Sequence, residues 1–407
     1  MSERIDRQLR DLLGDDAVER TADGLPRALP DSTESMAAVC AAAHASGWQV
    51  RVQGQGSWLP PDAPADLVIG TAALNQIVHL SPADLVASVQ PGTSLAEVQQ
   101  ALAAVGAWLA VDPPGRPDRT LGSIVATGTA GPLRHRYGMI RDQIVGCTIV
   151  TGDGRIVTAG GKVTKNVAGY DLVKLQAGGF GAFGIITLLH LRLRALPAAD
   201  LTLIARGERD PLTLLARELH EAQLDAAAIE LLSPAAAADS SWVLALRFLG
   251  HPAAVKAEAD RAHRSASGFS WTALDRERGG AFWHAAAHAM GGGMLSLRFG
   301  VLPEGLDETL DLLHHRIGLG LVSAGAAEGG LRWCGETDVP TMRELRQLLA
   351  AREVPVTLER APWRVRRITG HFGLYREGIG SLVGQLRRQF DPGDLLQVAL
   401  DADDEVS

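Results

Sequence analysis

Glycine-rich loops carry the clearest chemical signal in this sequence. The stretch VRVQGQGSWLPP, residues 50–61, brings an apolar extended run to Gly54 and Gly56, and similar loops follow at 127–131 (TGTAG) and 178–181 (GGFG). Glycine lets backbone N–H groups approach a bound anion closely, and successive N–H groups form anion-binding nests. Each loop alone could be a tight turn. Together they predict a diphosphate held by backbone amides without lysines.

The first loop differs from the dinucleotide fingerprint of Rossmann folds. That fingerprint, Gly-x-Gly-x-x-Gly, opens a helix directly after a strand. Here Pro60 and Pro61 follow the two glycines closely, and proline interrupts the hydrogen bonding of a helix interior. We therefore expect that no helix starts at this loop.

Side chains that could act as bases or metal ligands are scattered. His284 and His288 are four residues apart and would share a helix face, but Ala285 stands where a His-Glu-x-x-His zinc motif has glutamate. Ordinary helix surface or packing is the alternative. The run 134–136 (RHR) could face substrate or diphosphate, or be solvated loop charge, and His314-His315 has no evident partner. The sequence assigns no catalytic residue and no metal site.

Four arginines gather in ERAPWRVRRITG, residues 359–370. Their alternation with apolar residues predicts an edge strand that bears positive charge. Such a strand is either a solvated face that prevents aggregation or a docking surface for an acidic partner subunit. The arginines are Arg360, Arg364, Arg366 and Arg367.

Composition excludes several classes of protein. The chain has 407 residues, 46% of them hydrophobic, and a net charge of −8, which argues against sequence-independent nucleic-acid binding. No apolar run is long enough to span a membrane, and the start MSERIDRQLRDLL has charges where a signal peptide is apolar. Three scattered cysteines form neither a disulfide framework nor an iron–sulfur or zinc pattern. A cytoplasmic, reduced protein is expected.

Helix and turn signals divide the chain into four parts. These are a charged lead-in at 1–29, a first domain at 30–197, a second domain of alternating helices and short strands at 198–375, and a helix with its tail at 376–407. The more specific expectations are a capped helix at 31–47, a strand at 50–52, a helix from Ser94, a long functional loop at 111–138, a hairpin turning at Asp153-Gly154, and a last helix stopped by Asp391-Pro392.

In their order, these segments resemble the FAD-binding domain of the vanillyl-alcohol oxidase flavoprotein family, the PCMH type. The resemblance runs from about Pro30 through Leu196 and includes VQPGTSLAEV, RYGMIRD and GYDL. Within the family, GGKVTKNVAGYDL, GGLRWCGE and QLRRQFDP are most similar to the small flavin-binding subunits of bacterial glycolate oxidases.

The resemblance implies an α+β fold, in which a two-subdomain PCMH-type FAD-binding domain precedes a smaller α/β cap domain and a C-terminal helix. The cap should fold over the flavin, and the last helix should pack back on the first domain. The implied function is that of an FAD-binding subunit of a 2-hydroxy-acid dehydrogenase that oxidises glycolate to glyoxylate. It would work with a larger catalytic flavin subunit and an iron–sulfur subunit, in the cytoplasm or at the inner membrane through that complex.

Two other functions stay open. One is a self-sufficient FAD oxidoreductase for another small hydroxy acid or alcohol, and the other is a flavin-fold scaffold without its own catalysis. Residues 198–407 contain no histidine-rich substrate motif of the kind that the larger subunit carries. We therefore expect the isolated chain to bind FAD with little or no turnover.

The cofactor contacts implied by the resemblance lie on two phosphate loops and the segments after them. Some family members attach the flavin covalently through a histidine in the first loop, where this chain has Ser57 and Trp58, so the FAD should be non-covalent. Gln55 replaces a common third glycine, GFG at 179–181 replaces Ser-Glu-Gly, and the terminal Asn-Pro-Gly-Arg is missing. The implied contact residues are Gln53, Gly54, Gln55, Gly56, Ser57, Pro91, Gly122, Ser123, Thr127, Gly131, Tyr137, Gly138, Arg141, Asp142 and Ile186.

Overall fold

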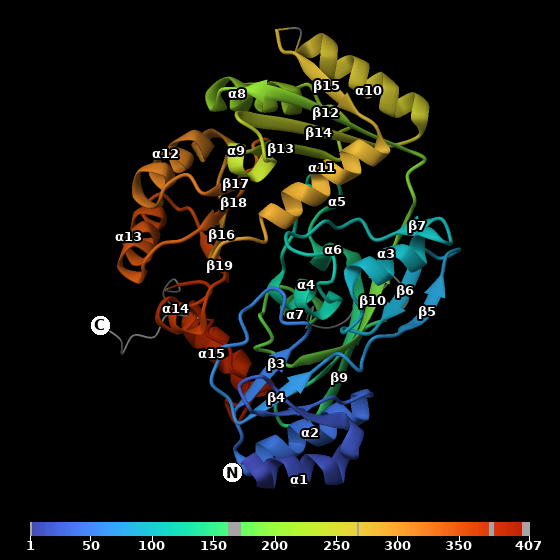
Figure 1. Cartoon of the computed structure of the whole chain (residues 1–407), viewed down its shortest axis with the longest axis vertical. Coiled ribbons are helices and arrows are strands. Elements are labelled where there is room, and N and C mark those ends of the chain that lie inside the picture. The colour runs from blue at the N-terminus through green and yellow to red at the C-terminus, as the bar shows by residue number, and fades with distance from the viewer. Residues whose placement is uncertain (1, 162–171, 267, 374–377, 401–407) are drawn as a thin grey trace.

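The computed structural model describes residues 2–161, 172–266, 268–373 and 378–400. Two lobes and a larger cap follow one another along the long axis of the molecule (Figure 1). The N-terminal lobe lies at the bottom of the view, the second lobe in the middle and the cap at the top. The stretch GGKVTKNVAGYDL lies almost wholly outside the described residues.

The N-terminal lobe is a four-stranded sheet in the order β1-β2-β4-β3, in which β2, β4 and β3 are parallel. Helix α2 begins after Ser32, whose hydroxyl accepts a hydrogen bond from Ser35 N, and ends at Gly47 in the left-handed conformation. Ile5 and Leu9 of α1 pack in the same core as the strands, so the lead-in at 1–29 is part of this lobe. The elements are α1 (Ser2–Leu13), η1 (Asp15–Ala17), β1 (Val18–Arg20), β2 (Pro26–Ala28), α2 (Thr33–Ser46), β3 (Val50–Gln53) and β4 (Leu67–Gly70).

An antiparallel sheet in the order β5-β6-β10-β8-β9 forms the second lobe. The expected helix from Ser94 and the hairpin at Asp153-Gly154 are confirmed. The expected long loop at 111–138 is wrong in part, because α4 and α5 lie within it; their seven and four residues are too few for a periodic pattern. The elements are β5 (Ile77–Ser81), β6 (Val86–Val89), α3 (Leu95–Ala103), β7 (Ala107–Trp108), α4 (Leu121–Thr127), α5 (Arg134–Tyr137), α6 (Ile140–Gln143), β8 (Ile144–Val150), β9 (Ile156–Gly160), α7 (Leu172–Gln176), β10 (Ile185–Arg192) and β11 (Arg194–Ala195).

The cap is an eight-stranded sheet in the order β15-β12-β14-β13-β17-β18-β16-β19, antiparallel throughout. Helices α8, α10, α12 and α13 share an apolar core with one face, while α9 and α11 pack on the other. The elements are β12 (Ala199–Gly207), α8 (Arg209–Glu221), β13 (Ala228–Leu232), α9 (Pro234–Ala237), β14 (Trp242–Gly250), α10 (Pro252–Ser265), β15 (Trp271–Leu274), α11 (Arg276–Ala289), β16 (Leu295–Gly300), η2 (Pro303–Gly305), α12 (Leu306–Ile317), β17 (Leu321–Gly325), β18 (Gly330–Gly335), α13 (Val339–Ala350), β19 (Val356–Arg360) and α14 (Trp363–Thr369).

The expectation of an arginine-bearing edge strand at 359–370 is correct only up to Arg360, since β19 lies at the edge of the cap sheet. Strand β19 ends at Arg360, and the following arginines belong to helix α14. The side chains of Arg360 and Arg366 are buried, so they offer no solvated docking surface. Val365 and Ile368 are three residues apart, which places them on one face of a helix but on opposite faces of a strand, and Pro362 directly before the helix also favours the helix.

The C-terminal helix α15 (Ile379–Phe390) packs back on the first part of the chain, as expected. The rings of Phe390 and Phe183 meet edge to face, and Gly152 N donates to the carbonyl of Phe390. Beyond the helix, Leu396 forms a parallel bridge with Val50 of β3. The last described residues therefore lie beside the first glycine loop.

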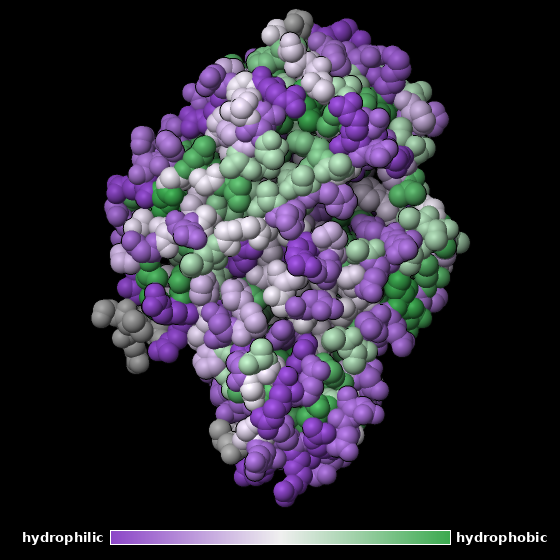
Figure 2. All heavy atoms as spheres, viewed as in Figure 1, coloured by the Kyte–Doolittle hydropathy of each residue, from purple (hydrophilic) through white to green (hydrophobic). Residues whose placement is uncertain are grey.

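The surface and the cysteines give little specific indication of function. Hydrophilic side chains are spread over the whole visible face, with apolar ones among them (Figure 2). Within the described ranges, the structure contains no helix that could cross a membrane. Cys40, Cys147 and Cys334 are free and buried.

Candidate cofactor site

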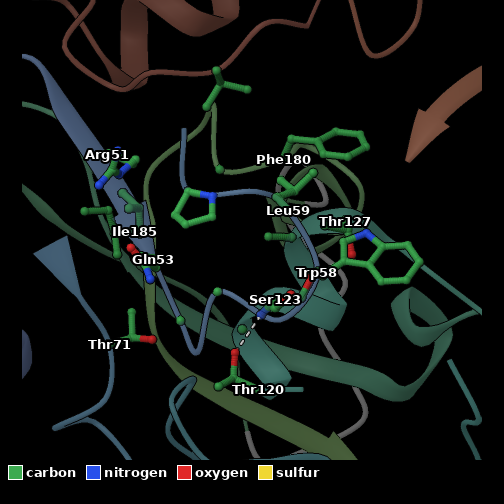
Figure 3. Close-up of a pocket in the computed structure, with 18 of the residues that line it drawn as sticks. Arg51, Gln53, Trp58, Leu59, Thr71, Thr120, Ser123, Thr127, Phe180 and Ile185 are labelled. Atoms are coloured by element: carbon green, nitrogen blue, oxygen red, sulfur yellow. Dashed lines mark hydrogen bonds between the residues drawn. The ribbon is translucent and has the colours of Figure 1, made fainter. Parts of the chain in front are cut away.

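A long cleft runs between the first glycine loop, helix α4 and the start of β10 (Figure 3). About 1210 Å³ of empty space lies within it, part of which is open solvent. Strand β3 leads into the loop and pairs with β4 in the parallel sheet, which buries Val50 but leaves Val52 exposed. The cleft therefore lies at the end of β3, where the chain continues into Gly54.

The glycines of the loop are there because other atoms are too close for a side chain. A Cβ on Gly54 would lie 2.6 Å from Thr120 Oγ1, and one on Gly122 would lie 2.7 Å from Pro91 Cβ. Gly56 has a φ of +68°, which side-chain-bearing residues rarely adopt. The loop thus lies directly on α4 and exposes its backbone to the cleft.

Ten of the fifteen residues expected to hold the cofactor line this cleft. They come from separate segments of the chain, which only the fold brings together. The ten are Gln53, Gly54, Gln55, Gly56, Ser57, Pro91, Gly122, Ser123, Thr127 and Ile186.

The other five lie outside the cleft. Gly131 is against the backbone of Asp112, whose carbonyl oxygen would be 1.8 Å from a Cβ there. Tyr137 packs edge to face on Trp108, with 5.5 Å between the ring centroids. Gly138 and Asp142 form a turn in which the Asp142 carboxylate accepts Met139 N at 2.8 Å, and the Arg141 side chain is 58% exposed. Their neighbours give all but Arg141 a structural role.

The cleft wall carries positive charge. Arg51 and Arg366 line it, and none of the described residues that line it is acidic. Both arginines pair with aspartates away from the wall, at 3.1 Å for Arg51–Asp23 and 2.8 Å for Arg366–Asp62. The Nε atom of each arginine is buried without a hydrogen-bond partner. A wall of this kind favours an anionic ligand.

His371 is a fixed, neutral part of the wall. Its ring stacks on Phe180 of the third glycine loop, with centroids 3.6 Å apart, and Nδ1 lies 2.6 Å from the carbonyl oxygen of Leu358. A carbonyl only accepts, so Nδ1 carries the proton and Nε2 does not. Burial lowers the pKa of His371 to about 3. The imidazole therefore stays neutral at physiological pH.

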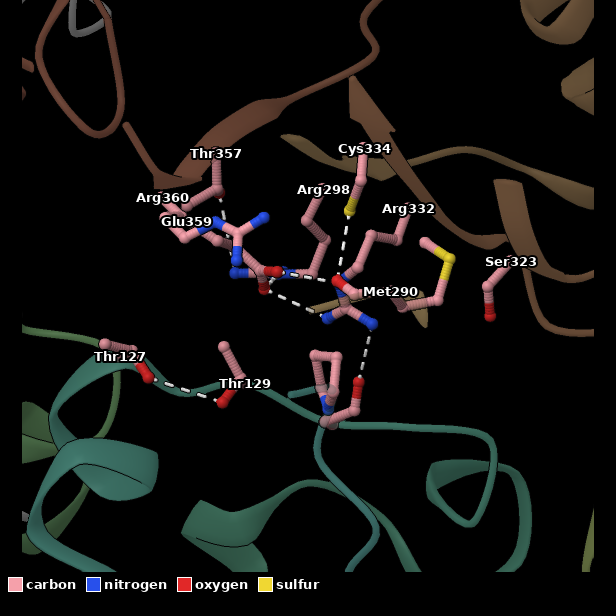
Figure 4. A network of polar contacts seen from close by, with 12 residues as sticks. Thr127, Thr129, Met290, Arg298, Ser323, Arg332, Cys334, Thr357, Glu359 and Arg360 are labelled. Carbon is pink, nitrogen blue, oxygen red and sulfur yellow. Dashed lines mark hydrogen bonds and ion pairs between the residues drawn. The ribbon is translucent and has the colours of Figure 1, made fainter. Parts of the chain in front are cut away.

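A polar network joins the second glycine loop to the cap (Figure 4), and Trp58 ties the first glycine loop to the same network. Trp58 Nε1 donates to the backbone carbonyl of Glu359, and Arg332 Nη1 donates to the carbonyl of Ala130, both at 3.0 Å. Between them, the Glu359 carboxylate accepts Arg332 Nε at 2.7 Å and Arg298 Nε at 2.9 Å. The cap is thus anchored to the loops that form and adjoin the cleft.

Cations outnumber carboxylates in this network. Arg119 lies 4.1 Å and Arg360 5.0 Å from the centroid of the Trp58 ring. Arg119 donates to Pro114 O and Thr127 Oγ1, and burial lowers its pKa to about 9, which leaves it charged at neutral pH. Arg360 donates to the carbonyls of Gly291, Gly292 and Gly293.

Sequence reasoning missed Arg298, Arg332 and Glu359, although a signal was present. Each is a charged residue in an apolar strand: LSLRFG, GLRWCG and VTLER. Because side chains alternate along a strand, these three point away from the apolar core that holds Leu297, Leu331 and Leu358. Charged residues on the inner face of a sheet indicate a polar interface.

The other candidates have structural partners. Arg134 pairs with Glu328 at 2.8 Å and Glu230 at 3.5 Å, and His135 lies 3.0 Å from Glu328, so this run binds the cap rather than a ligand. His284 and His288 are exposed on α11. Over the parts of the chain that the structure describes, no group of three or more potential ligands could hold a metal ion.

The cleft fits the diphosphate of a dinucleotide cofactor. Gly54 and Gly122 leave room only for backbone, the wall has two guanidiniums, and its orphaned Arg51 and Arg366 Nε donors match the charge of phosphate oxygens. The residues present thus suit FAD.

Comparisons with known proteins agree with this geometry. Residues 27–160 match the family described as FAD binding domain. The glycolate oxidase subunit GlcE of Escherichia coli (strain K12) is 40% identical over 128 residues, 31% of this chain and 37% of that protein. The glycolate oxidase subunit GlcD of Bacillus subtilis (strain 168) is 34% identical over 142 residues, 35% of this chain and 30% of that protein. The matched segments thus span about a third of these relatives.

A mitochondrial D-lactate dehydrogenase [cytochrome] of Arabidopsis thaliana is 32% identical over 143 residues, 35% of this chain and 24% of that protein. Among solved structures, an alkyldihydroxyacetonephosphate synthase has a TM-score of 0.75 and covers 97% of this chain and 84% of its own at 14% identity, which shows a shared fold. Residues 27–160 are therefore an FAD binding domain of the PCMH type, and about a third of the chain is similar to glycolate oxidase subunits and to a D-lactate dehydrogenase.

Proposed function

We propose that the chain binds FAD non-covalently in the cleft and is the FAD-binding subunit of a glycolate-oxidase-like 2-hydroxy-acid dehydrogenase. A larger catalytic flavin subunit and an iron–sulfur subunit would complete the complex. The observation that carries the proposal is the cleft itself, in which the glycines of the first loop lie on α4 and the wall has no acidic residue among those described.

Each part of the cleft has a distinct task in this proposal. The backbone amides around Gly54 and Gly56 hold the diphosphate, while Ser123 and Thr127 offer hydroxyls from α4. Phe180 and Trp58 exclude water from one side. Bound FAD supplies the capacity to accept electrons from a hydroxy acid or a neighbouring subunit. The protein residues bind and orient it.

The attachment of the flavin is directly measurable. Ser57 and Trp58 stand where some family members have the linking histidine, so acid precipitation of the purified yellow protein should release all of the flavin into the supernatant. The absorbance of the supernatant at flavin wavelengths, compared with that of the redissolved pellet, measures the division. Flavin that stays on the denatured chain would contradict non-covalent binding.

A self-sufficient FAD oxidoreductase is the second candidate function. The observation in its favour is the surplus of guanidiniums at the seam with the cap, since Arg298 and Arg332 share the carboxylate of Glu359 while Arg360 donates to backbone carbonyls. Cations of this kind could hold a substrate carboxylate. A proton acceptor is also needed, and the nearby histidines are engaged, one with a backbone carbonyl and one with a carboxylate.

Turnover by the isolated chain separates the two functions. With FAD, an artificial dye acceptor and glycolate or lactate, the isolated chain should reduce the dye slowly or not at all, since positioned general-base help typically contributes about 10²–10⁴-fold. Coexpression with the two other subunits should restore dye reduction. Rapid reduction by the isolated chain would refute the subunit function and establish the self-sufficient enzyme.

A further inference from the structure

The cofactor cleft draws on the cap as well as on the FAD binding domain. Arg366 belongs to α14, far beyond the matched range 27–160, yet it lines the cleft together with Arg51 of β3. These two are the only guanidiniums among the described residues of the wall. One comes from each half of the chain, so the electrostatics of the cleft depends on how the halves are joined.

Arg366 is held rigidly at this place. Nη2 donates to Asp62 Oδ1 at 2.8 Å and to the carbonyl of Pro60 at 3.1 Å, both in the segment that leaves the first glycine loop. Asp62 also accepts the backbone N–H of Trp363 at 2.7 Å. The Arg366 side chain is 5% exposed, and its Nε has no partner. A fixed guanidinium with spare donors is pre-organised for an anion.

The aspartate partner only partly neutralises this charge. The side chain of Asp62 is 41% exposed, so water stabilises its carboxylate while the guanidinium is almost fully buried. Burial lowers the pKa of Arg366 despite the contact with Asp62, which indicates that the charged form is under-compensated. The Arg51 side chain is likewise buried, at 7% exposed, beside an Asp23 that is 51% exposed. A doubly charged diphosphate would supply what is missing.

We propose that Arg366 is a cofactor-binding residue, which donates from the cap to the diphosphate of FAD and complements the glycine loops and Arg51. The inference rests on the proposed FAD site. It assigns to the cap a direct part in holding the cofactor, in addition to covering it. The glycine loops contribute dipoles without net charge, so the arginine contribution is ionic and depends on salt.

The test compares three ligands on one set of variants. FAD contains the diphosphate and the flavin, ADP contains the diphosphate without the flavin, and riboflavin contains the flavin without phosphate. Arg366→Gln should weaken the binding of FAD and ADP about 10- to 100-fold, the range expected for loss of a hydrogen bond to a charged group. The affinity for riboflavin should stay almost unchanged. The dissociation constants are measured by calorimetry or flavin fluorescence on the full chain, at two salt concentrations.

The Asp62→Asn variant distinguishes cofactor binding by Arg366 from a purely structural role of its ion pair with Asp62. It breaks the same ion pair but keeps the guanidinium, so FAD and ADP affinity should stay unchanged or rise. Arg367→Gln, at an exposed position on the same helix, is the matched control and should change no affinity. If Arg366→Gln does not fold, Arg366→Lys takes its place, and it should weaken ADP more than riboflavin.

If Asp62→Asn and Arg366→Gln lowered the affinity for FAD and ADP equally, the inference would be overturned, and the ion pair would have only a structural role. The inference would also be overturned if Arg366→Gln or Arg366→Lys lowered the affinity for riboflavin as much as the affinity for ADP. It would be overturned as well if neither variant lowered the affinity for FAD and ADP. Failure of the unmodified chain to bind FAD would instead refute the proposed function. The two results are read from different proteins and cannot be confused.

Discussion

Replacing Glu359 with glutamine should lower the free energy of unfolding by about 3–5 kcal/mol, the typical cost of breaking a buried ion pair by removing one partner. The Glu359 side chain is fully buried and accepts hydrogen bonds from Arg332 and Arg298. Glutamine fills the same space but carries no charge, so the buried Arg332 would lose the carboxylate that it contacts through both Nε and Nη2. Urea unfolding, followed by tryptophan fluorescence, measures the difference.

An exposed ion pair provides the matched control. Glu344 pairs with Arg316 at 2.6 Å, and the two side chains are 53% and 44% exposed. Glu344→Gln should cost about 0–1 kcal/mol because water screens the pair. Equal losses for the two variants would show that the seam network does not stabilise the fold.

The same carboxylate makes stability depend on pH. Burial opposes ionisation of Glu359, but Arg332 and Arg298 outweigh it, so its folded pKa lies below the ordinary value of 4.5. A lowered folded pKa stabilises the native state above the unfolded pKa, and this stabilisation is lost as the pH falls through the folded pKa. The difference between the unmodified chain and Glu359→Gln should therefore be largest near neutral pH and shrink below about 4.5.

The second large effect is expected at Gly56. Gly56→Val should weaken FAD binding about 10- to 100-fold, because a non-glycine residue held at positive φ costs about 1–3 kcal/mol, and valine is β-branched. The φ there is +68°, and a Cβ would lie 2.8 Å from Gln53 Nε2. The loop would relax into a conformation that no longer presents its amides to the diphosphate. Flavin fluorescence quenching measures the dissociation constant.

Gly14→Val separates loss of the site from general strain. Gly14 has a φ of +87°, a Cβ there would meet no atom within 4 Å, and the residue lies in the lead-in, away from the cleft. This variant should lose stability and keep its FAD affinity. Unchanged affinity in Gly56→Val would show that the first loop does not hold the cofactor.

Local patterns were sufficient for elements whose cause lies within a few residues. The capped start of α2, its end at Gly47, the start of α3 after Ser94 and the turn at Asp153-Gly154 all depend on hydrogen bonds or φ angles set by neighbours in the chain. The glycine loop after β3 belongs to the same class. An ordered series of such signals was also enough to identify the FAD binding domain.

Local patterns failed to predict secondary structure where a segment is too short for its hydrophobic spacing to repeat. The arginine run after Arg360 was expected as a strand and is the helix α14, and the region 111–138 contains short helices below the length of a detectable repeat. Propensity is a weak prior over so few residues, and packing against the sheet decides the outcome. Of the four arginines, Arg360 and Arg366 are buried, whereas Arg364 and Arg367 are exposed.

The amino-acid sequence by itself determined the glycine loops and the capped helices, because these depend on backbone freedom and short-range hydrogen bonds, and the order of its motifs indicated FAD through the family resemblance. Only the tertiary structure decided which charged side chains lie close to one another. Arg51 and Arg366 are far apart in the chain and line one cleft, and Glu359 joins Arg298, Arg332 and Trp58 across the seam. Coulomb interactions depend on distance and burial, which no spacing in one sequence specifies.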